Sequence, residues 1–304
     1  YSGGCALNSS ANKLLTNNKN FFEKTFINCA PGDNGGALGA AFIVAANYNL
    51  ELTNIKSPYL GKKFDDTQIK KILEKDHYKK KLTFDYFKSD DELFRTASKY
   101  ISEGKVIGWF QNKMEFGPRA LGSRSILGDA RSPDMQKKLN LKVKFRESFR
   151  PFAPAILHED LNEWFDLDSE SPYMLLVGKV KEDKLLEQTP DQKLAKGLEK
   201  LNIIRSKIPA VTHVDNSARI QTVTAENGIY YDLIKLFKKK TGCPVIVNTS
   251  FNVRGEPIVN TPTDAFNCFM GTELDYLVIG DCILDKTKQD PKLKKDYTKE
   301  FELD

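Results

Sequence analysis

The chain has 304 residues, the length of about two domains. Apolar residues make up 40% and charged residues 29%, a globular composition that excludes a disordered chain. The 46 basic and 41 acidic side chains leave a net charge of +5 and are mixed along the sequence, which argues against a nucleic-acid-binding module. No apolar run reaches the roughly 18 residues of a membrane span and no secretory signal is visible, so we expect a cytoplasmic location.

The five cysteines are widely spaced and contain no CxxC pair, which predicts free thiols rather than disulfides or a zinc site. The first residue is Tyr rather than Met and lies inside what looks like a motif. We therefore expect the sequence to be the C-terminal part of a longer protein.

The first 90 residues predict loops and helices built from small side chains, followed by a linker rich in Lys and Asp. We place a domain boundary at about 80–92. The elements expected before it are a tight loop at Gly3-Gly4, a helix over 6–17, a strand over 26–29, a glycine loop over 31–36, a helix over 37–47 and a short helix over 67–75.

From residue 90 onward, helical and strand patterns alternate, which predicts an α/β or α+β fold. The charged stretch 181–201 reads as a surface insertion. The helices are expected over 91–102, 133–141, 228–239 and 263–270, and the strands over 106–110, 152–156, 173–180, 209–213, 220–223, 244–247 and 276–279.

The densest candidate site is the run MEFGPRALGSRSIL (114–127), which follows a predicted strand and continues as a glycine-rich turn. Arg119 and Arg124 lie among small and apolar residues, where a buried guanidinium needs an anionic partner. That partner is either a phosphate or carboxylate ligand or a structural acid such as Glu115 or Asp129, and the spacing does not choose between them.

A second basic segment, 141–152, carries Lys144, Arg146 and Arg150 beside three phenylalanines. If the segment is helical, Arg146 and Arg150 share one face and repel unless an anion lies between them. Spacing alone favours a solvated basic face, whereas the recurrence of arginine in two Gly/Pro-containing segments favours one shared anion pocket.

Two further polar runs follow predicted strands. Asn248, Ser250 and Asn252 lie at the end of an apolar strand, where ligands of α/β sheets bind, although the run taken alone favours a turn that caps the strand. His213, Asp215 and Arg219 are a weaker cluster between two strand patterns.

The N-terminal segment offers two more candidates. Gly3, Gly4 and Asn8 suit the close approach of a nucleotide, and Asp33 is a candidate metal ligand, with a turn or cap residue as the simpler alternative.

These runs together resemble the NodU/CmcH-type O-carbamoyltransferase family, in order and over nearly the whole chain. The runs that carry the resemblance are GGCALN (3–8), GDNGGALGAA (32–41), MEFGPRALGSRSIL (114–127), SFRPFAPA (148–155), VDNSARIQTV (214–223) and VNTSFN (247–252).

The resemblance implies a twisted mixed sheet with helices of the YrdC-like type over 90–304, preceded by the C-terminal fragment of an ASKHA (actin/sugar-kinase-like) domain over 1–80. It implies that the YrdC-like domain forms carbamoyl-adenylate from carbamoyl phosphate and ATP, and that the actin-like domain transfers the carbamoyl group to a hydroxyl of a small-molecule acceptor. Mg²⁺ would accompany ATP. Asp33 matches a ligand of the divalent metal, iron or similar, in the complete actin-like domain, whose HxxxH pair is absent here.

The resemblance and the chemistry of the residues predict the following sites. Fixed cations should dominate a reaction between two anions. We expect Arg119, Arg124, Lys144, Arg146 and Arg150 to hold phosphate and carbamoyl phosphate oxygens, and Asn248, Ser250 and Asn252 to orient the carbamoyl or nucleotide groups, with His213, Asp215 and Arg219 nearby.

Two other functions stay open. One is a related enzyme that makes threonylcarbamoyl-adenylate for tRNA modification. The other is a non-catalytic subunit that partners a separately encoded N-terminal half. The sequence also leaves open a homo-oligomer and the identity of the acceptor.

Overall fold

The computed structural model describes residues 1–17, 22–51, 57–74, 82–294 and 296–297. Ten strands form one mixed sheet in the order β1-β10-β9-β2-β3-β8-β4-β7-β6-β5. Only the pairs β2–β9 and β4–β7 are parallel among the described strands. The strands are β1 (Asp85–Tyr86), β2 (Ile107–Phe110), β3 (Arg124–Asp129), β4 (Ala153–Leu157), β5 (Phe165–Asp166), β6 (Leu176–Val180), β7 (Ser217–Val223), β8 (Val245–Ser250), β9 (Tyr276–Ile279) and β10 (Cys282–Asp285).

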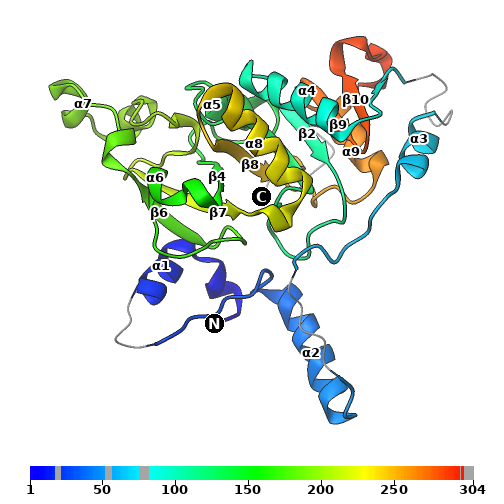
Figure 1. Cartoon of the computed structure of the whole chain (residues 1–304). Coiled ribbons are helices and arrows are strands. Elements are labelled where there is room, and N and C mark those ends of the chain that lie inside the picture. The colour runs from blue at the N-terminus through cyan, green and yellow to red at the C-terminus, as the bar shows by residue number, and fades with distance from the viewer. Residues whose placement is uncertain (18–21, 52–56, 75–81, 295, 298–304) are drawn as a thin grey trace.

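Helices cover this sheet and its ends, apart from α2 (Asp33–Asn47), which projects away from it (Figure 1). They are α1 (Ser9–Asn17), α2 (Asp33–Asn47), α3 (Asp66–Glu74), α4 (Asp90–Ser102), α5 (Met135–Lys142), α6 (Leu161–Trp164), α7 (Pro190–Leu194), α8 (Ile229–Thr241) and α9 (Pro262–Gly271). The predicted α/β class is therefore confirmed.

The central strands β2, β3 and β4 are buried along their whole length, because helices and loops cover the sheet. Val245, Ile246 and Val247 of β8 are fully buried, and α4 and α8 pack on each other and against β2, β3, β4 and β8. Local signals set the helix ends: Thr261 caps α9 through a reciprocal hydrogen-bonded box with Asp264, and Gly242 ends α8 in the left-handed conformation.

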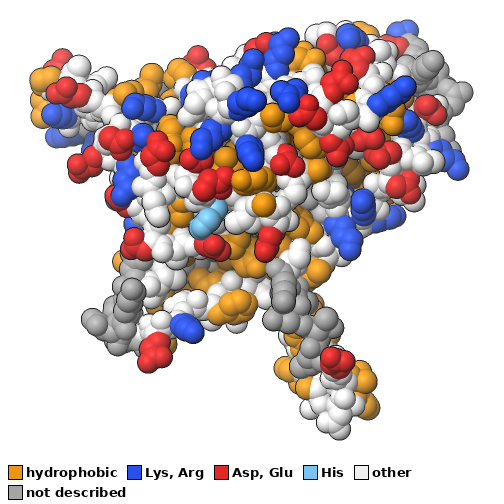
Figure 2. All heavy atoms as spheres, in the orientation of Figure 1, with side chains coloured by type: hydrophobic (Ala, Val, Ile, Leu, Met, Phe, Trp, Pro, Cys, Tyr) orange, Lys and Arg blue, Asp and Glu red, His pale blue; other side chains and the backbone are white. Residues whose placement is uncertain are grey.

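The N-terminal region joins this body at its β6 side. Helix α1 packs on β6, where the Asn12 amide donates to the carbonyls of Ala6 (2.7 Å) and Leu175 (3.0 Å). Helix α2 instead projects away from the body and buries none of its residues (Figure 1). Its exposed apolar side chains include Ile43 and Val44, and Figure 2 shows hydrophobic side chains along the projection.

Several expected elements are wrong or differ in length. Residues 26–29 form no strand, and 209–213 begins as the 3₁₀ helix Pro209–Val211, because the proline supplies no hydrogen for a strand ladder. The end of the predicted glycine-rich turn is strand β3, and the basic segment after α5 is a loop in which Phe145 has φ of 48°. Short strands β1, β5 and β10 were not expected. Residue 75 of the expected helix and residues 80–81 of the proposed boundary lie outside the described residues.

Candidate anion site

Three guanidinium groups from distant parts of the chain influence one another: Arg119 in the loop between β2 and β3, Arg146 after α5, and Arg219 on β7. Burial, and then the positive charges of Arg119 and Arg146, lower the pKa of Arg219 to about 9. Burial, and then the neighbouring Arg150, lower the pKa of Arg146 to about 10, and burial also lowers the pKa of Arg119. We call Arg119, Arg146 and Arg219 the arginine cluster.

No member of the arginine cluster forms an ion pair in the part of the chain that the structure describes, although the charge of Glu147 acts to raise the pKa of Arg146, against the larger effects of burial and Arg150. The described ion pairs of the body involve other cations, such as Arg131 with Asp129 (2.7 Å) and Lys138 with Asp275 (2.8 Å). The Nε atoms of Arg119 and Arg219 are buried without a hydrogen-bond partner.

Arg146 donates its Nε–H to the Asn140 side chain (2.7 Å) and lies over the Phe152 ring (5.0 Å), but both of these partners are neutral. Cations that influence one another without a carboxylate partner are unfavourable in an empty protein, so this arrangement suits a bound anion with several oxygens.

A buried carboxylate shapes the loop that carries Arg119. The Oε1 atom of Glu115 accepts backbone N–H groups from Leu121 (2.7 Å), Ser123 (2.7 Å) and Arg124 (3.2 Å). Glu115 therefore organises the backbone instead of forming the salt bridge that the sequence suggested as an alternative. This role was missed, although an acid within a buried apolar run was its visible signal.

Two amide side chains of the sheet tie the same loop to β7 and β8. Asn248 donates to the Ala120 carbonyl (3.0 Å) and to Gln221 Oε1 (2.6 Å), and Gln221 donates to the Leu121 carbonyl (2.9 Å). Gln221 lies two residues after Arg219 on β7, so both point to one face of the sheet. Asn248 and Gln221 thus hold the loop of Arg119 over the strand that carries Arg219.

Lys144 closes the cluster at the end of β8. Its fully buried ammonium donates to the carbonyl (2.5 Å) and hydroxyl (3.2 Å) of Ser250, and to the carbonyl (2.9 Å) and side-chain oxygen (2.7 Å) of Asn252. Burial, and then the charge of Arg146, lower the pKa of Lys144 to about 7. The structure thus brings together three predicted site residues from two distant segments, and places them next to Arg146.

Arg124 does not point to this site, which corrects the sequence-based prediction. Cross-strand pairing aligns Ser125 with Ser250 and Leu127 with Asn248, so Arg124 points to the opposite face, over the ring of Phe110 (3.6 Å). It is fully buried there.

The guanidinium of Arg124 donates to four backbone carbonyls. These belong to Gln111 (2.6 Å), Asn112 (3.2 Å), Ser123 (3.2 Å) and Lys62 (3.1 Å). Arg124 therefore fastens the start of β3 to the segment around Lys62.

The remaining predicted residues of the body lie around the cluster. Arg150 is exposed and paired with Glu147 (2.9 Å) on a loop rather than on a helix face. His213 hydrogen-bonds Ser217 (3.0 Å), and burial lowers its pKa, which keeps the ring neutral at pH 7. Asp215 accepts from Ser217 (2.6 Å) and Lys179 (3.1 Å) at the edge of a cleft of about 820 Å³.

The N-terminal candidates serve local structure. Gly3 has φ of 90° and donates its N–H to Pro31, Gly4 begins a 3₁₀ turn, and the side chain of Asn8 accepts the N–H of Ala11 at the start of α1. Asp33 is exposed in the first turn of α2. No group of three His, Cys, Asp or Glu side chains that could hold a metal exists in the described ranges, so the donor set for the predicted iron-type centre is not complete there.

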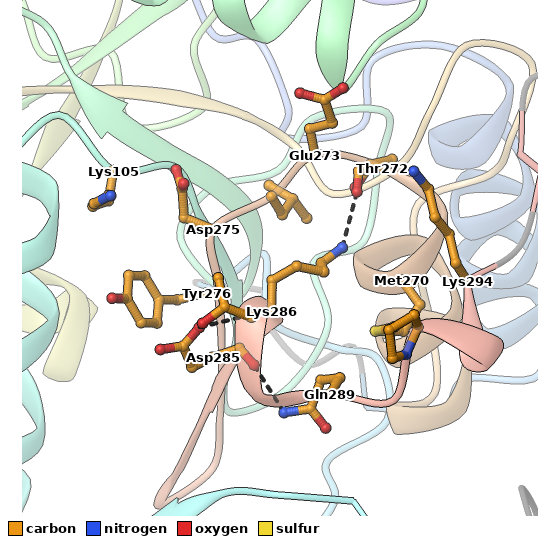
Figure 3. A pocket seen from close by; sticks show the side chains of 13 residues that line it. Lys105, Met270, Thr272, Glu273, Asp275, Tyr276, Asp285, Lys286, Gln289 and Lys294 are labelled. Atoms are coloured by element: carbon orange, nitrogen blue, oxygen red, sulfur yellow. Dashed lines mark hydrogen bonds between the residues drawn. The ribbon is translucent and has the colours of Figure 1, made fainter.

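A separate pocket of about 460 Å³ lies at the β9–β10 edge of the sheet (Figure 3). Its partly buried cation, Lys286, donates to the carbonyls of Phe269 and Thr272 at the end of α9. Because this ammonium already has helix-end partners, the pocket does not reproduce the unpaired charge of the arginine cluster.

Comparison with known proteins places the chain in a family. The family model described as "Carbamoyltransferase C-terminus" matches residues 98–286. The chain belongs to this carbamoyltransferase family. An uncharacterized protein of Synechocystis is 50% identical over 99% of the chain and 50% of its own length.

Two relatives carry functional names. Nodulation protein NolO of Bradyrhizobium diazoefficiens is 39% identical over 93% of this chain and 48% of its own length. The 3'-hydroxymethylcephem-O-carbamoyltransferase of Streptomyces clavuligerus is 31% identical over 92% of this chain and 47% of its own length. The chain therefore spans about half the length of the curated relatives it matches.

Among solved structures, full-length HypF in a phosphate- and nucleotide-bound form matches with a TM-score of 0.40 and 18% identity, over 68% of this chain and 22% of that chain.

Within the described residues, no helix combines the length and the apolar character needed to cross a bilayer.

Proposed function

We propose that this chain is the part of an O-carbamoyltransferase that binds carbamoyl phosphate and ATP and forms carbamoyl-adenylate. The observation that carries the proposal is the arginine cluster, three largely buried guanidinium groups without a carboxylate partner among the described residues. Family membership supplies the carbamoyl group as the moiety that is transferred. The acceptor would be a hydroxyl of a small molecule.

The proposed reaction needs positioning and charge neutralisation rather than a side-chain nucleophile. Water first cleaves carbamoyl phosphate to carbamate and inorganic phosphate, which leaves. An oxygen of the carbamate then attacks the α-phosphorus of ATP, and the bond from that phosphorus to the departing pyrophosphate breaks, which yields carbamoyl-adenylate. Arg119, Arg146 and Arg219 hold the anionic oxygens together, which offsets the repulsion between two anions. Lys144 orders the end of β8, and Asn248 keeps the loop of Arg119 in place.

Metal ions enter the proposal only as companions of the substrate. Mg²⁺ would arrive with ATP, whose phosphates supply its ligands. Asp33 does not form a metal site with other described side chains, so no step of the proposal runs through the iron-type centre. Transfer to the acceptor is assigned to the complete protein, of which relatives show about twice this length.

Pyrophosphate–ATP exchange that depends on carbamoyl phosphate tests the proposal. Arg119→Met and Arg219→Met should reduce exchange at least about 100-fold, a loss typical of removing a group that stabilises transition-state charge. Arg95→Met is the matched control, because Arg95 is exposed on α4 and paired with Asp91. Equal exchange rates in all three variants would contradict the proposal.

The same assay separates the alternatives. Exchange that requires bicarbonate and threonine instead of carbamoyl phosphate would identify a threonylcarbamoyl-adenylate enzyme. A chain that binds phosphate but supports no exchange with either input would match the non-catalytic partner subunit. A homo-oligomer would appear directly in the molar mass in solution.

A further inference from the structure

Glu256, which has no role in the proposed function, forms several hydrogen bonds with the turn after β8. The backbone carbonyl of Glu256 accepts the side-chain N–H of Asn252 (2.6 Å), and its carboxylate accepts the N–H of Val253 (2.8 Å) and the hydroxyl of Tyr297 (3.1 Å). Asn252 in turn accepts Lys144 through its side-chain oxygen (2.7 Å). Glu256 is therefore linked to the buried ammonium of Lys144 through Asn252.

The surroundings of Lys144 contain opposing charges. Burial and then Arg146 favour the neutral amine, whereas Cys268 on α9 and the carboxylate of Glu256 act in the opposite sense. Because burial raises the pKa of the Cys268 thiol, this thiol is uncharged near neutral pH, and Glu256 supplies the negative charge there. Lys286 acts on Cys268 in the opposite sense to Glu256, because its positive charge lowers the pKa of that thiol whereas the carboxylate raises it. The negative charge of Glu256 therefore acts on Lys144 from the turn after β8, the same segment that supplies the hydrogen-bond acceptors of Lys144.

We propose that Glu256 is a positioning residue that fixes the turn after β8 and keeps Lys144 charged beside the arginine cluster. The inference rests on the proposed function, because it concerns the same anion site. A charged Lys144 donates three hydrogens to Ser250 and Asn252 and adds positive potential next to Arg146. A neutral amine donates only two, so the turn loosens and the site attracts an anion less strongly.

The pH dependence of sulfate binding tests this role, because sulfate keeps its double charge across the neutral range. For the unchanged chain, affinity should fall several-fold as pH rises from about 6 to about 8, with a midpoint near 7, since the protonated Lys144 favours the anion. Burial lowers the pKa of His213 below the usual 6.5, so its ring loses its proton at lower pH than the midpoint expected for Lys144.

Charge and geometry are separated by three variants. Glu256→Gln removes the charge, and the midpoint should move down by about one pH unit, a tenfold change in the protonated fraction at a given pH. Glu256→Asp and Tyr297→Phe keep the charge but alter the contacts, and both should keep the midpoint near that of the unchanged chain. A purely structural role would weaken binding in all three without moving any midpoint.

A second substitution keeps the inference testable if Glu256→Gln does not fold. Lys144→Arg stays charged at all pH values used, so the transition near neutral pH should disappear; its persistence would overturn the inference. An unshifted midpoint in folded Glu256→Gln would overturn the inference as well. If the unchanged chain still binds sulfate in that case, the proposed anion site stands and only the role of Glu256 fails. Absence of sulfate binding by the unchanged chain would instead remove the anion site and this inference together.

Discussion

Replacing Arg219 with Met should stabilise the empty protein while it weakens anion binding. The pKa of Arg219 falls from 12.5 to about 9, a drop of about 3.5 units. At about 1.4 kcal/mol per unit this sets a ceiling of about 5 kcal/mol on the cost of the charged group. Arginine stays charged at neutral pH, so the fold bears that cost. After local relaxation, we expect Arg219→Met to raise the free energy of unfolding by about 1–3 kcal/mol.

Urea unfolding at pH 7.5 and low salt, without phosphate or sulfate, measures this effect. Arg131→Met is the matched control with the opposite expected sign, because Arg131 pairs with the largely buried Asp129 (2.7 Å). Its removal leaves a buried carboxylate unpaired and should cost about 1–3 kcal/mol. A loss of stability in Arg219→Met as large as in Arg131→Met would refute the reasoning that the cluster is strained when empty.

Three further predictions concern single residues. Arg124→Lys should lower the free energy of unfolding by about 2–4 kcal/mol, since one ammonium cannot serve four carbonyls in the same geometry; a change below about 0.5 kcal/mol in urea unfolding would contradict this. Gly122→Ala should lower the free energy of unfolding by about 3 kcal/mol, because φ is 110° and the new Cβ would lie 2.2 Å from the Tyr230 ring. Gly104→Ala is the control: its surroundings are open, and it should lower the same free energy by about 1 kcal/mol. In the folded chain the pKa of Lys144 is lowered to about 7, so above that pH the unfolded chain binds one more proton and the free energy of unfolding should rise with pH. Lys144→Met should remove this rise. The same slope of unfolding free energy against pH in the variant would argue against a buried titrating amine.

The alternating patterns predicted most of the long elements because burial of one face leaves a clear period. The expected helix over 228–239 is α8, and the apolar run at 244–247 is the core of β8. The strand expected at 209–213 failed, since apolar residues with a leading proline also fit a short 3₁₀ turn against α5. Short edge strands such as β1 and β5 have two residues and carry no readable period.

The candidate site was predictable in composition but not in orientation. Arg119 and Arg124 look equivalent in the sequence, yet the register of β3 directs Arg124 to the other face, where carbonyls take up its hydrogens. Lys144, Ser250 and Asn252 were named from separate runs, and only the fold shows that they share hydrogen bonds. Gln221 lay within a quoted motif, but its role depends on strand pairing that no local pattern reveals.

Calorimetric titration of inorganic phosphate into the unchanged chain and its variants tests the central claim most directly. If Arg119, Arg146 and Arg219 surround one anion, the unchanged chain should bind one phosphate per chain. Each single Met replacement should then weaken binding at least about tenfold, while Arg95→Met should leave it unchanged. Undiminished binding in all three cluster variants would show that these side chains do not form a common anion site.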